Sequence, residues 1–112
     1  MIVEKFEKIM AKNLKEIFME SEIEQLSKKF KLLSEPSRLK ILRALFEGEK
    51  CVTEIIDATG LMQANVSKQL KIMQGNGILE CRPEGLQRFY SVADNTVLDI
   101  CNILCGRNPN DT

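Results

Sequence analysis

The 112-residue sequence contains no histidine and no tryptophan. Without an imidazole, the chain has no histidine ligand for zinc, no histidine general base and no histidine to activate a serine or cysteine nucleophile. A Gly-rich phosphate-binding loop and a motif of converging carboxylates are also missing from the sequence. These absences argue against an enzymatic function.

Long apolar runs and an excess of charge of either sign are absent as well. No stretch approaches the roughly 18 apolar residues that span a bilayer. The N-terminus alternates apolar and charged residues from the start, unlike a secretory signal. The formal net charge is +0, which gives no bulk argument for nucleic-acid binding, and 44% hydrophobic with 29% charged residues is typical of a globular domain. We therefore expect a cytoplasmic protein without a membrane partner.

The sequence has 4 cysteines, and no two of them have CxxC spacing. A zinc ribbon is therefore not expected, and a cytosolic chain is not expected to carry a structural disulfide framework. The cysteines are Cys51, Cys81, Cys101 and Cys105. We therefore expect four free thiols, which either pack in the core or at an interface or bind or react with an effector.

Apolar residues at helical spacing predict an amphipathic helix over residues 2–18. Its charges are mixed rather than basic, so we expect it to pack on the domain or on a dimer mate rather than on a membrane. Ser21 and Glu24 have capping-box spacing and predict the start of a second helix. The residues expected to be buried along this helix are Ile23, Leu26, Phe30 and Leu33.

Ser34 is expected to cap a third helix, with Pro36 tolerated in its first turn and an end near Gly48. The buried residues expected along it are Leu39, Leu42, Leu45 and Phe46. Cys51 then stands where an N-cap serine would be expected, with Glu54 three places on. This pattern predicts a short helix that reaches about residue 58 and breaks at the glycine that follows.

Residues 62–75 form the next predicted helix, and residues 78–82 and 87–92 have the composition of two strands. Residues 83–86 join these strands as a hairpin. Asp94 or Asn95 can cap a last helix that runs through Cys105 and stops at Gly106. The fold class is mainly α with a small β-hairpin. The expected organisation is an N-terminal helix over 1–20, one domain over 21–106 and a polar tail over 107–112.

Two short helices joined by a glycine turn and followed by a hairpin have the layout of a winged helix-turn-helix. In such a unit the second helix enters the major groove of DNA. Val66, Leu70 and Met73 share one face of this helix and should be core. The residues expected to contact DNA are Gln63, Ala64, Ser67, Lys68 and Lys71. Gln63 can pair with an adenine edge, whereas the serine and the lysines suit phosphates.

Arg82 and Arg88 flank the tip of the predicted hairpin. From there they could reach an adjacent minor groove or the DNA backbone. The excess of positive over negative charge across residues 60–92, which hold this helix and the hairpin, is slight. A dimer would have to double this excess to bind a duplex well.

Three segments of the sequence resemble the signature of the ArsR/SmtB repressor family. They are Leu33–Leu42 (LSEPSRLKIL), Thr59–Leu70 (TGLMQANVSKQL) and Arg88–Val92 (RFYSV). The resemblance implies a homodimeric winged-helix repressor of double-stranded operator DNA, whose first and last helices build the dimer interface. It also implies operator contacts from the positions that match Gln63, Ala64, Ser67 and Lys68, with the wing at residues 82–88. We expect DNA binding to require no cofactor.

The chain departs from the family pattern at two positions of the helix over 62–75. Met62 stands where the family usually has a serine that caps this helix, so we expect a looser helix start. Gln69 replaces a frequent histidine, and we expect it to alter the preferred operator sequence.

The resemblance also indicates which sensor sites are missing. The family's zinc site on the last helix is matched only at Asp94, because no histidine follows. The family's arsenite or cadmium segment, Cys-Val-Cys-Asp-Leu, corresponds to Cys51–Ile55, where Thr53 replaces the second cysteine. The cysteine pair of the sulfide-sensing members is not matched, since its first position aligns with Arg43.

Cys101 and Cys105 are four residues apart on the last predicted helix, so both point from one face. With Cys51 of either chain as a third ligand, they could bind a soft ion such as As(III) or Cd(II). Oxidation is the rival signal, because the helix dipole at Cys51 favours the reactive thiolate. Simple packing of Cys101 and Cys105 at an interface is the third interpretation.

The function predicted from the sequence is a homodimeric repressor that a thiol-reactive effector releases from its operator. A soft metal or metalloid ion is the preferred effector, and an oxidant or reactive sulfur species is the alternative. A winged-helix protein-interaction module without operator binding is the alternative from another class. A steep salt dependence of promoter binding separates a DNA-binding regulator from such a module.

Overall fold

The computed structural model describes residues 19–107, which divide into two units between Ser34 and Glu35. The first unit holds α2 (Glu20–Leu33), whose N-cap is Met19. The Met19 carbonyl accepts hydrogen bonds from the amides of Glu22 (3.0 Å) and Ile23 (2.9 Å). The predicted cap at Ser21 is therefore wrong, because helical hydrogen bonding already begins at Met19. The helix expected over residues 2–18 lies outside the described residues, as does the tail beyond residue 107.

The apolar face predicted for α2 is not buried in the single chain. Ile23 and Leu26 are each 41% exposed and Phe30 is 52% exposed, whereas Leu33 is half-buried. The hydrophobic effect disfavours leaving such a row of large side chains in water. Within the described residues 19–107, the burial expected for Ile23, Leu26 and Phe30 is therefore not observed.

The second unit begins with α3 (Pro36–Phe46), which has a proline at its first position as predicted. Glu35, not Ser34, is its N-cap and accepts a hydrogen bond from the Ser37 amide at 3.3 Å. Ser34 instead ends α2, where its hydroxyl donates to the Lys31 carbonyl at 2.7 Å. The predicted cap at Ser34 is therefore wrong by one position.

The buried side of α3 differs in part from the predicted one. Leu42 and Leu45 are buried as expected, but Leu39 is 39% exposed. Phe46 is only half-buried. Ile41 and Ala44 take part in the core instead. The burial stripe is thus rotated around the helix, because α3 contacts α4, α5 and β3 at once.

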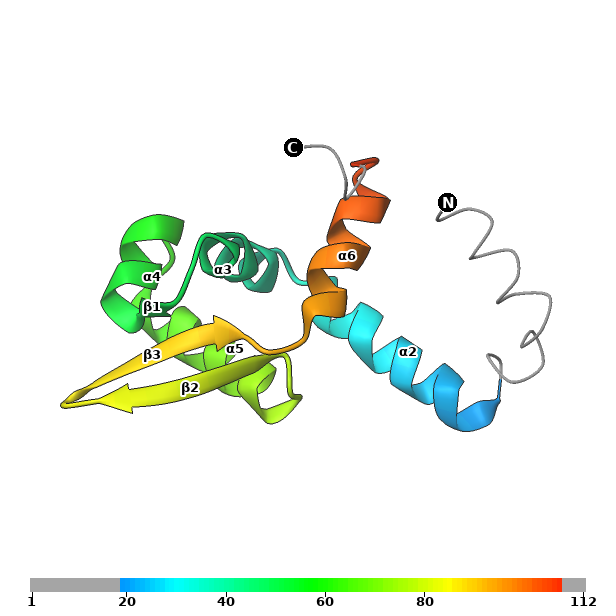
Figure 1. Ribbon diagram of the computed structural model, residues 1–112, viewed down its shortest axis with the longest axis horizontal. Coiled ribbons are helices and arrows are strands. Elements are labelled where there is room, and N and C mark those ends of the chain that lie inside the picture. The colour runs from blue at the N-terminus through cyan, green and yellow to red at the C-terminus, as the bar shows by residue number, and fades with distance from the viewer. Residues whose placement is uncertain (1–18, 108–112) are drawn as a thin grey trace. The chain divides into compact units, whose positions relative to one another are not determined.

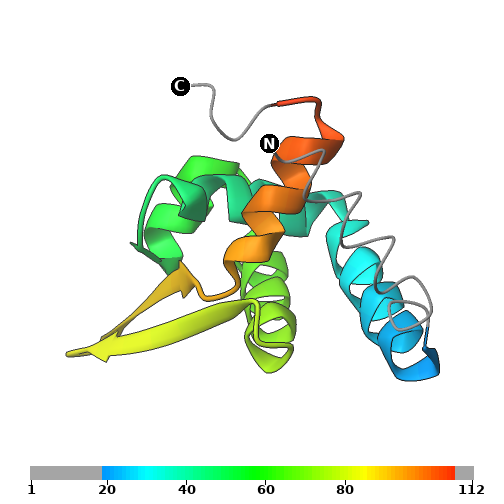
Figure 2. The same ribbon diagram turned by 45° about the vertical axis from the view of Figure 1, so that its right-hand side comes forward.

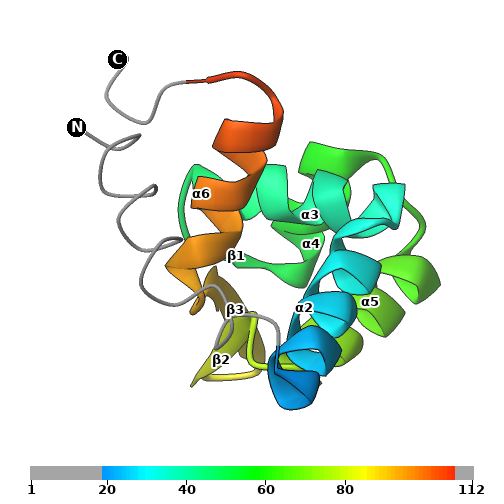
Figure 3. The ribbon, with the colours of Figure 1, turned by 90° about the vertical axis from the view of Figure 1, so that its right-hand side faces the viewer.

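Helices α4 (Val52–Thr59) and α5 (Gln63–Gly75) form the predicted pair joined by a glycine turn. Gly60 ends α4 in the left-handed conformation, with φ of 71°, which a glycine adopts without a steric penalty. α4 and α5 contact each other, and both contact α3. Figure 3 shows this three-helix cluster, with α5 alongside the strands.

The strands form a three-stranded antiparallel sheet in the order β1-β3-β2. β2 (Leu79–Glu84) and β3 (Gln87–Val92) make the hairpin, and β1 (Lys50–Cys51) is a short third strand that the sequence pattern does not predict. The hairpin loop is shorter than predicted, because Glu84 pairs with Gln87 and only Gly85 and Leu86 lie between them. Gly85 has φ of 62°, as two-residue turns with glycine first require. The hairpin projects well beyond the helices of this unit (Figure 2).

The last helix, α6 (Asn95–Leu104), follows β3 (Figure 1). Asp94 caps it as predicted, accepting from the Thr96 amide at 3.0 Å, and Gly106 follows its end with φ of 75°. The large side chains buried most completely come from α3, α4, α5, the start of the hairpin and α6. They are Ile41, Leu42, Ile55, Val66, Leu70, Met73, Ile78 and Val97.

The predicted fold class is confirmed: the described residues form helices and one small antiparallel sheet in the order of a winged helix-turn-helix. No helix within residues 19–107 is both long enough and apolar enough to cross a bilayer. The hairpin and α5, the elements expected to contact DNA, belong to one unit.

Candidate nucleic-acid interface

Helix α5 has one fully buried face and one exposed polar face. Val66, Leu70 and Met73 are at most 1% exposed and anchor the helix against the core. The residues of α5 that are assigned to DNA contact all lie on its exposed side: Gln63, Ala64, Ser67, Lys68 and Lys71. The helix can therefore present amide, hydroxyl and ammonium groups to a groove without losing any core contact.

A partly buried polar network, centred on the buried Gln69, lies between α5 and α3. Gln69 is only 6% exposed, so it faces α3 and not solvent. Its Oε1 accepts a hydrogen bond from the Arg38 guanidinium at 2.9 Å, and its Nε2 donates to Asn65 Oδ1 at 2.9 Å. Asn65 Nδ2 in turn donates to the Ser37 hydroxyl at 3.1 Å. The expected role of Gln69 in operator preference thus cannot come from direct base contact.

The first turn of α5 has no side-chain cap. Met62 is the N-cap residue, with φ of −71° and ψ of 147°, and it makes no side-chain hydrogen bond to the helix. Its side chain is 80% exposed. This confirms that the helix start lacks the capping group, although the backbone geometry of an N-cap is in place.

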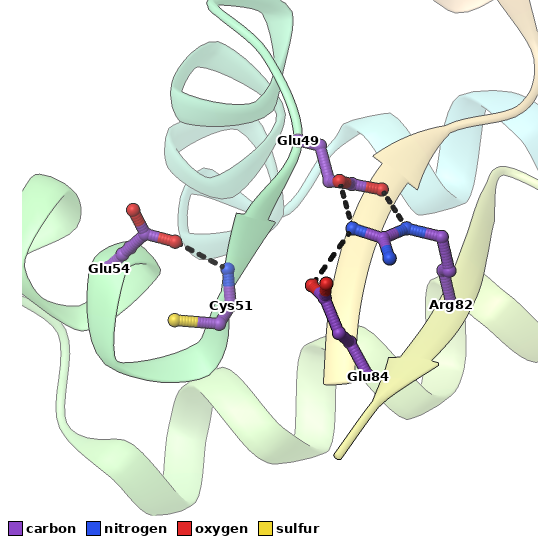
Figure 4. Close-up of polar contacts among 5 residues, drawn as sticks. All are labelled: Glu49, Cys51, Glu54, Arg82 and Glu84. Carbon is purple, nitrogen blue, oxygen red and sulfur yellow. Dashed lines mark hydrogen bonds and ion pairs between the residues drawn. The ribbon is translucent and has the colours of Figure 1, made fainter. Parts of the chain in front are cut away.

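Arg82 on β2 is paired with carboxylates, although its side chain is exposed. Its guanidinium donates two hydrogen bonds to Glu49, at 2.7 and 3.1 Å, and contacts Glu84 at 3.4 Å (Figure 4). It also lies over the Phe89 ring, 5.0 Å from the centroid, as a cation–π contact. The hydrogen bond from Arg82 lowers the pKa of Glu49. This arginine therefore ties the hairpin to the chain just before β1.

Arg88 on β3 is exposed and, within residues 19–107, makes no ion pair. It lines an open hollow of about 260 Å³ between the hairpin tip and the start of α4. The hollow is lined by Cys51, Val52, Thr53, Leu86, Gln87 and Arg88. Of the two arginines assigned to the wing, Arg88 has the charge available for a phosphate.

Cys51 joins β1 to α4. It is the N-cap of α4 as predicted, and its amide donates to Glu54 Oε1 at 3.0 Å (Figure 4). This hydrogen bond lowers the pKa of Glu54. The Cys51 side chain is 6% exposed, and its Sγ lies 3.2 Å from Thr53 Oγ1. Cys51 also pairs with Phe89 of β3, so the helix cap and the wing meet at one residue.

Cys101 and Cys105 lie one turn apart at the end of α6, where the Cys105 amide donates to the Cys101 carbonyl at 3.0 Å. Cys101 is half-buried and Cys105 is exposed. Burial, and next the neighbouring Cys105, raise the pKa of Cys101. Among residues 19–107 no three acidic, cysteine or histidine side chains gather as a metal site, so one chain does not bring Cys51 to this pair.

Comparison with known proteins identifies the group to which this arrangement belongs. The model of the family described as bacterial regulatory protein, arsR family, matches residues 35–80. The antimony-specific transcriptional repressor AntR has a crystal structure with 31% identity and a TM-score of 0.73, covering 80% of this chain and 82% of that one. The chain belongs to the ArsR family.

Two more regulators, one described as possibly of the ArsR family, are similar over much of the chain. A transcriptional repressor SmtB homolog of Synechocystis is 32% identical over 76% of this chain, which spans 64% of that protein's length. The homodimeric winged helix-turn-helix domain of a Mycobacterium bovis regulator has 30% identity and a TM-score of 0.67, over 75% of this chain and 78% of that domain. These relatives are transcriptional regulators, so the expectation of a regulator rather than an enzyme is confirmed at the level of the family.

The ArsR signature segments did not predict which polar side chains connect α5 and the hairpin to the rest of the unit. Gln69, Asn65 and Arg38 lie within them, but their contacts were missed because partners about 30 residues apart leave no local pattern. Glu49, the partner of Arg82, was missed for the same reason. A polar residue on the apolar side of a helical wheel, as Gln69 is beside Leu70, is the one signal that could have indicated a buried network.

Proposed function

We propose that this ArsR-family chain is a homodimeric repressor that binds operator DNA in the cytoplasm through α5 and the hairpin. The observation that carries the proposal is the division of α5 into a fully buried apolar face and an exposed polar face. Gln63 and Ala64 at the start of α5 would meet base edges, and Ser67, Lys68 and Lys71 would bind phosphates. Arg88 would add a contact from the wing, whereas Arg82 would hold the wing in place.

Dimerisation is supported by large apolar side chains exposed on α2 and α6. On α6, Ile103 is 60% exposed and Leu104 is 72% exposed, besides the exposed residues of α2. A symmetric pair would bury such side chains and present α5 twice, at the half-site spacing of an operator. The homodimeric relative from Mycobacterium bovis supports this assembly.

A soft metal or metalloid ion is the effector that we propose, bound by Cys101 and Cys105. Thiolates one helical turn apart select soft ions such as As(III), Sb(III) and Cd(II). The similarity to an antimony-specific repressor supports this choice. Because Cys51 does not join the pair within one chain, a three-thiolate site would have to take its third sulfur from the partner chain. DNA binding itself needs no cofactor in this proposal.

Limited access to the thiols favours the ion over the oxidant, because Cys51, the expected site of oxidation, is only 6% exposed and burial raises the pKa of Cys101. An oxidant must find an existing thiolate, and burial lowers the thiolate fraction of Cys101. A soft ion deprotonates a coordinating thiol outright and so overcomes the same penalty. The effector would release DNA only if it binds the DNA-incompetent dimer more tightly, and about 1.4 kcal/mol of coupling gives a tenfold loss of operator affinity.

The first experiment measures binding to a duplex that carries the promoter of the chain's own gene, over a series of salt concentrations. We expect specific binding whose affinity falls steeply with salt. Gln63→Ala and Lys68→Ala should weaken it strongly, and Lys40→Ala, a change of an exposed lysine on α3, should not. Binding that is absent, or that ignores both α5 changes, would favour a protein-interaction module.

The second experiment titrates the operator complex of the reduced protein with antimonite, arsenite and Cd(II), and in parallel with polysulfide and peroxide. We expect the ions to release the DNA, and Cys101→Ser and Cys105→Ser to abolish the release. Cys81→Ser, which changes a half-buried thiol on β2, is the matched control and should respond as the wild type does. A response to none of these agents would end the thiol-sensor proposal and leave the repressor proposal standing.

A further inference from the structure

A partly buried network of hydrogen bonds ties α5 to α3 at two points. Arg38 and Ser37 are neighbours in the first turns of α3, and Gln69 and Asn65 are one turn apart on α5. Arg38 binds Gln69 at 2.9 Å, Ser37 binds Asn65 at 3.1 Å, and Gln69 joins Asn65 at 2.9 Å. The four side chains therefore form one continuous chain of hydrogen bonds across the interface of the two helices.

This network differs in kind from the apolar packing around it. Val66 and Leu70, which flank Gln69 and Asn65 on α5, are buried by the non-directional hydrophobic effect. Apolar side chains tolerate a small rotation or slide of a helix, whereas a hydrogen bond weakens steeply when its distance or angle changes. Two ties one turn apart, about 6 Å along the helix axis, resist both rotation and sliding.

The network is fully satisfied. Among the described residues, no buried side-chain nitrogen or oxygen lacks a hydrogen-bond partner. The bond from Arg38 to Gln69 is charge-assisted and therefore stronger than a neutral one. A buried amide with both ends paired specifies one geometry, because any other arrangement of α5 leaves a buried group unpaired.

We propose that Arg38, Ser37, Asn65 and Gln69 are positioning residues that fix the orientation of α5, and thereby determine operator specificity without touching a base. This inference rests on the proposed function of α5. Gln63 and Ala64 can read base edges only if α5 holds them at hydrogen-bond distance from the groove floor. Phosphate contacts by long lysine side chains tolerate a looser helix.

The consequence is a split between two affinities. A variant that loses the network should lose discrimination between the operator and unrelated DNA, while its binding to unrelated DNA stays nearly unchanged. Partial unfolding would have another signature, since it lowers the active fraction and reduces both affinities by the same factor. The ratio of the two affinities thus separates a positioning role from a merely structural one.

The experiment compares Gln69→Leu, which removes both amide bonds, with Gln74→Leu, the same change at an exposed site on α5. Fluorescence anisotropy is measured with the promoter duplex and with a scrambled duplex of equal length. We expect Gln69→Leu to lower the affinity ratio about tenfold, the value of one good base contact. Its affinity for the scrambled duplex should change by less than about twofold. Gln74→Leu should leave both affinities unchanged.

A double-mutant cycle with Arg38→Met gives the second readout. If the two residues act through one network, Arg38→Met should lower the ratio in the wild type and have little further effect in Gln69→Leu. The slope of affinity against salt should stay constant, since Arg38 would not be a phosphate contact.

Three outcomes overturn the inference in distinguishable ways. An unchanged ratio in Gln69→Leu, or equal losses on both duplexes, refutes the positioning role and leaves the proposed function intact. A salt slope reduced by Arg38→Met assigns that residue to phosphate binding instead. A wild-type protein that does not distinguish the two duplexes refutes the proposed function and this inference together.

Discussion

Replacing Met62 by serine should stabilise the protein, because it supplies a missing cap to α5. Met62 already has the extended backbone of an N-cap, and its carbonyl accepts the hydrogen bond of the Val66 amide at 3.0 Å. The only element absent is a side-chain acceptor for the free amides of the first turn. Serine can provide it without any movement of the backbone.

The size of the effect follows from the exposure of the side chain that is lost. Met62 is 80% exposed, so little apolar burial is given up on its removal. A serine cap contributes about 1 kcal/mol relative to alanine at the same position. For a domain of this size, that corresponds to a rise of about 4 °C in melting temperature. We therefore expect the unfolding free energy of Met62→Ser to exceed that of Met62→Ala by about 1 kcal/mol. The unfolding free energy of Met62→Ala should stay close to that of the wild type.

Urea unfolding followed by circular dichroism measures the difference. All three proteins must be compared at the same concentration, because association adds to apparent stability. Equal unfolding free energies for the serine and alanine variants would refute the reasoning. Such a result would mean that the first amides of α5 already find a partner in the assembled protein.

Three further predictions concern the wing, the cap of α4 and the core. Arg88→Ala should reduce the slope of log K against log salt by about 1 per subunit. Arg82→Ala should leave that slope unchanged, because the charge of Arg82 is already paired with carboxylates, and equal slopes for both variants would contradict the assignment. The lowered pKa of Glu54 means that its contribution to stability is complete above about pH 4.5 and is lost as the pH falls through the lower folded value. Glu54→Gln should therefore flatten the acid limb of stability in unfolding curves measured across that range, and an unchanged limb would show that this carboxylate does not matter. Met73→Ala should lower the unfolding free energy by about 2–5 kcal/mol, since Met73 is fully buried on α5, and a urea-unfolding loss below about 1 kcal/mol would contradict its place in the core.

The sequence predicted those features that local physics determines. Gly60 and Gly106 end helices in the left-handed conformation, and Asp94 and Cys51 stand at helix starts, so each boundary is encoded within a few residues. The two-sided character of α5 is likewise a matter of helical spacing. These elements were predicted within one or two residues of their observed bounds.

The features that were missed depend on contacts between distant residues or between chains. Arg82 and Glu49 are 33 residues apart, and Arg38 and Gln69 are 31 apart, so no periodicity links them. Strand β1 has only two residues and exists because β3 pairs with it. The apolar face of α2 was expected to be buried, but helical spacing identifies such a face without indicating what covers it, and its side chains are exposed within residues 19–107.

The pairing of Arg82 has a consequence for how such a regulator could find its site. Glu49 and Glu84 pair with the charge of Arg82. The remaining cations of α5 and of the β2–β3 hairpin in one chain are Lys68, Lys71 and Arg88. Presented twice by a dimer, they would make at most six phosphate contacts and give a salt slope no steeper than about −5.4. Binding to random DNA would then be weak, and the affinity for the operator would depend mainly on base contacts from the start of α5. If an effector shifted α5 slightly, the helix would lose those base contacts. The remaining electrostatic attraction would then be too small to keep the protein on the DNA. A measured slope much steeper than this limit would show that further cations, from α2 or from residues before it, take part in binding.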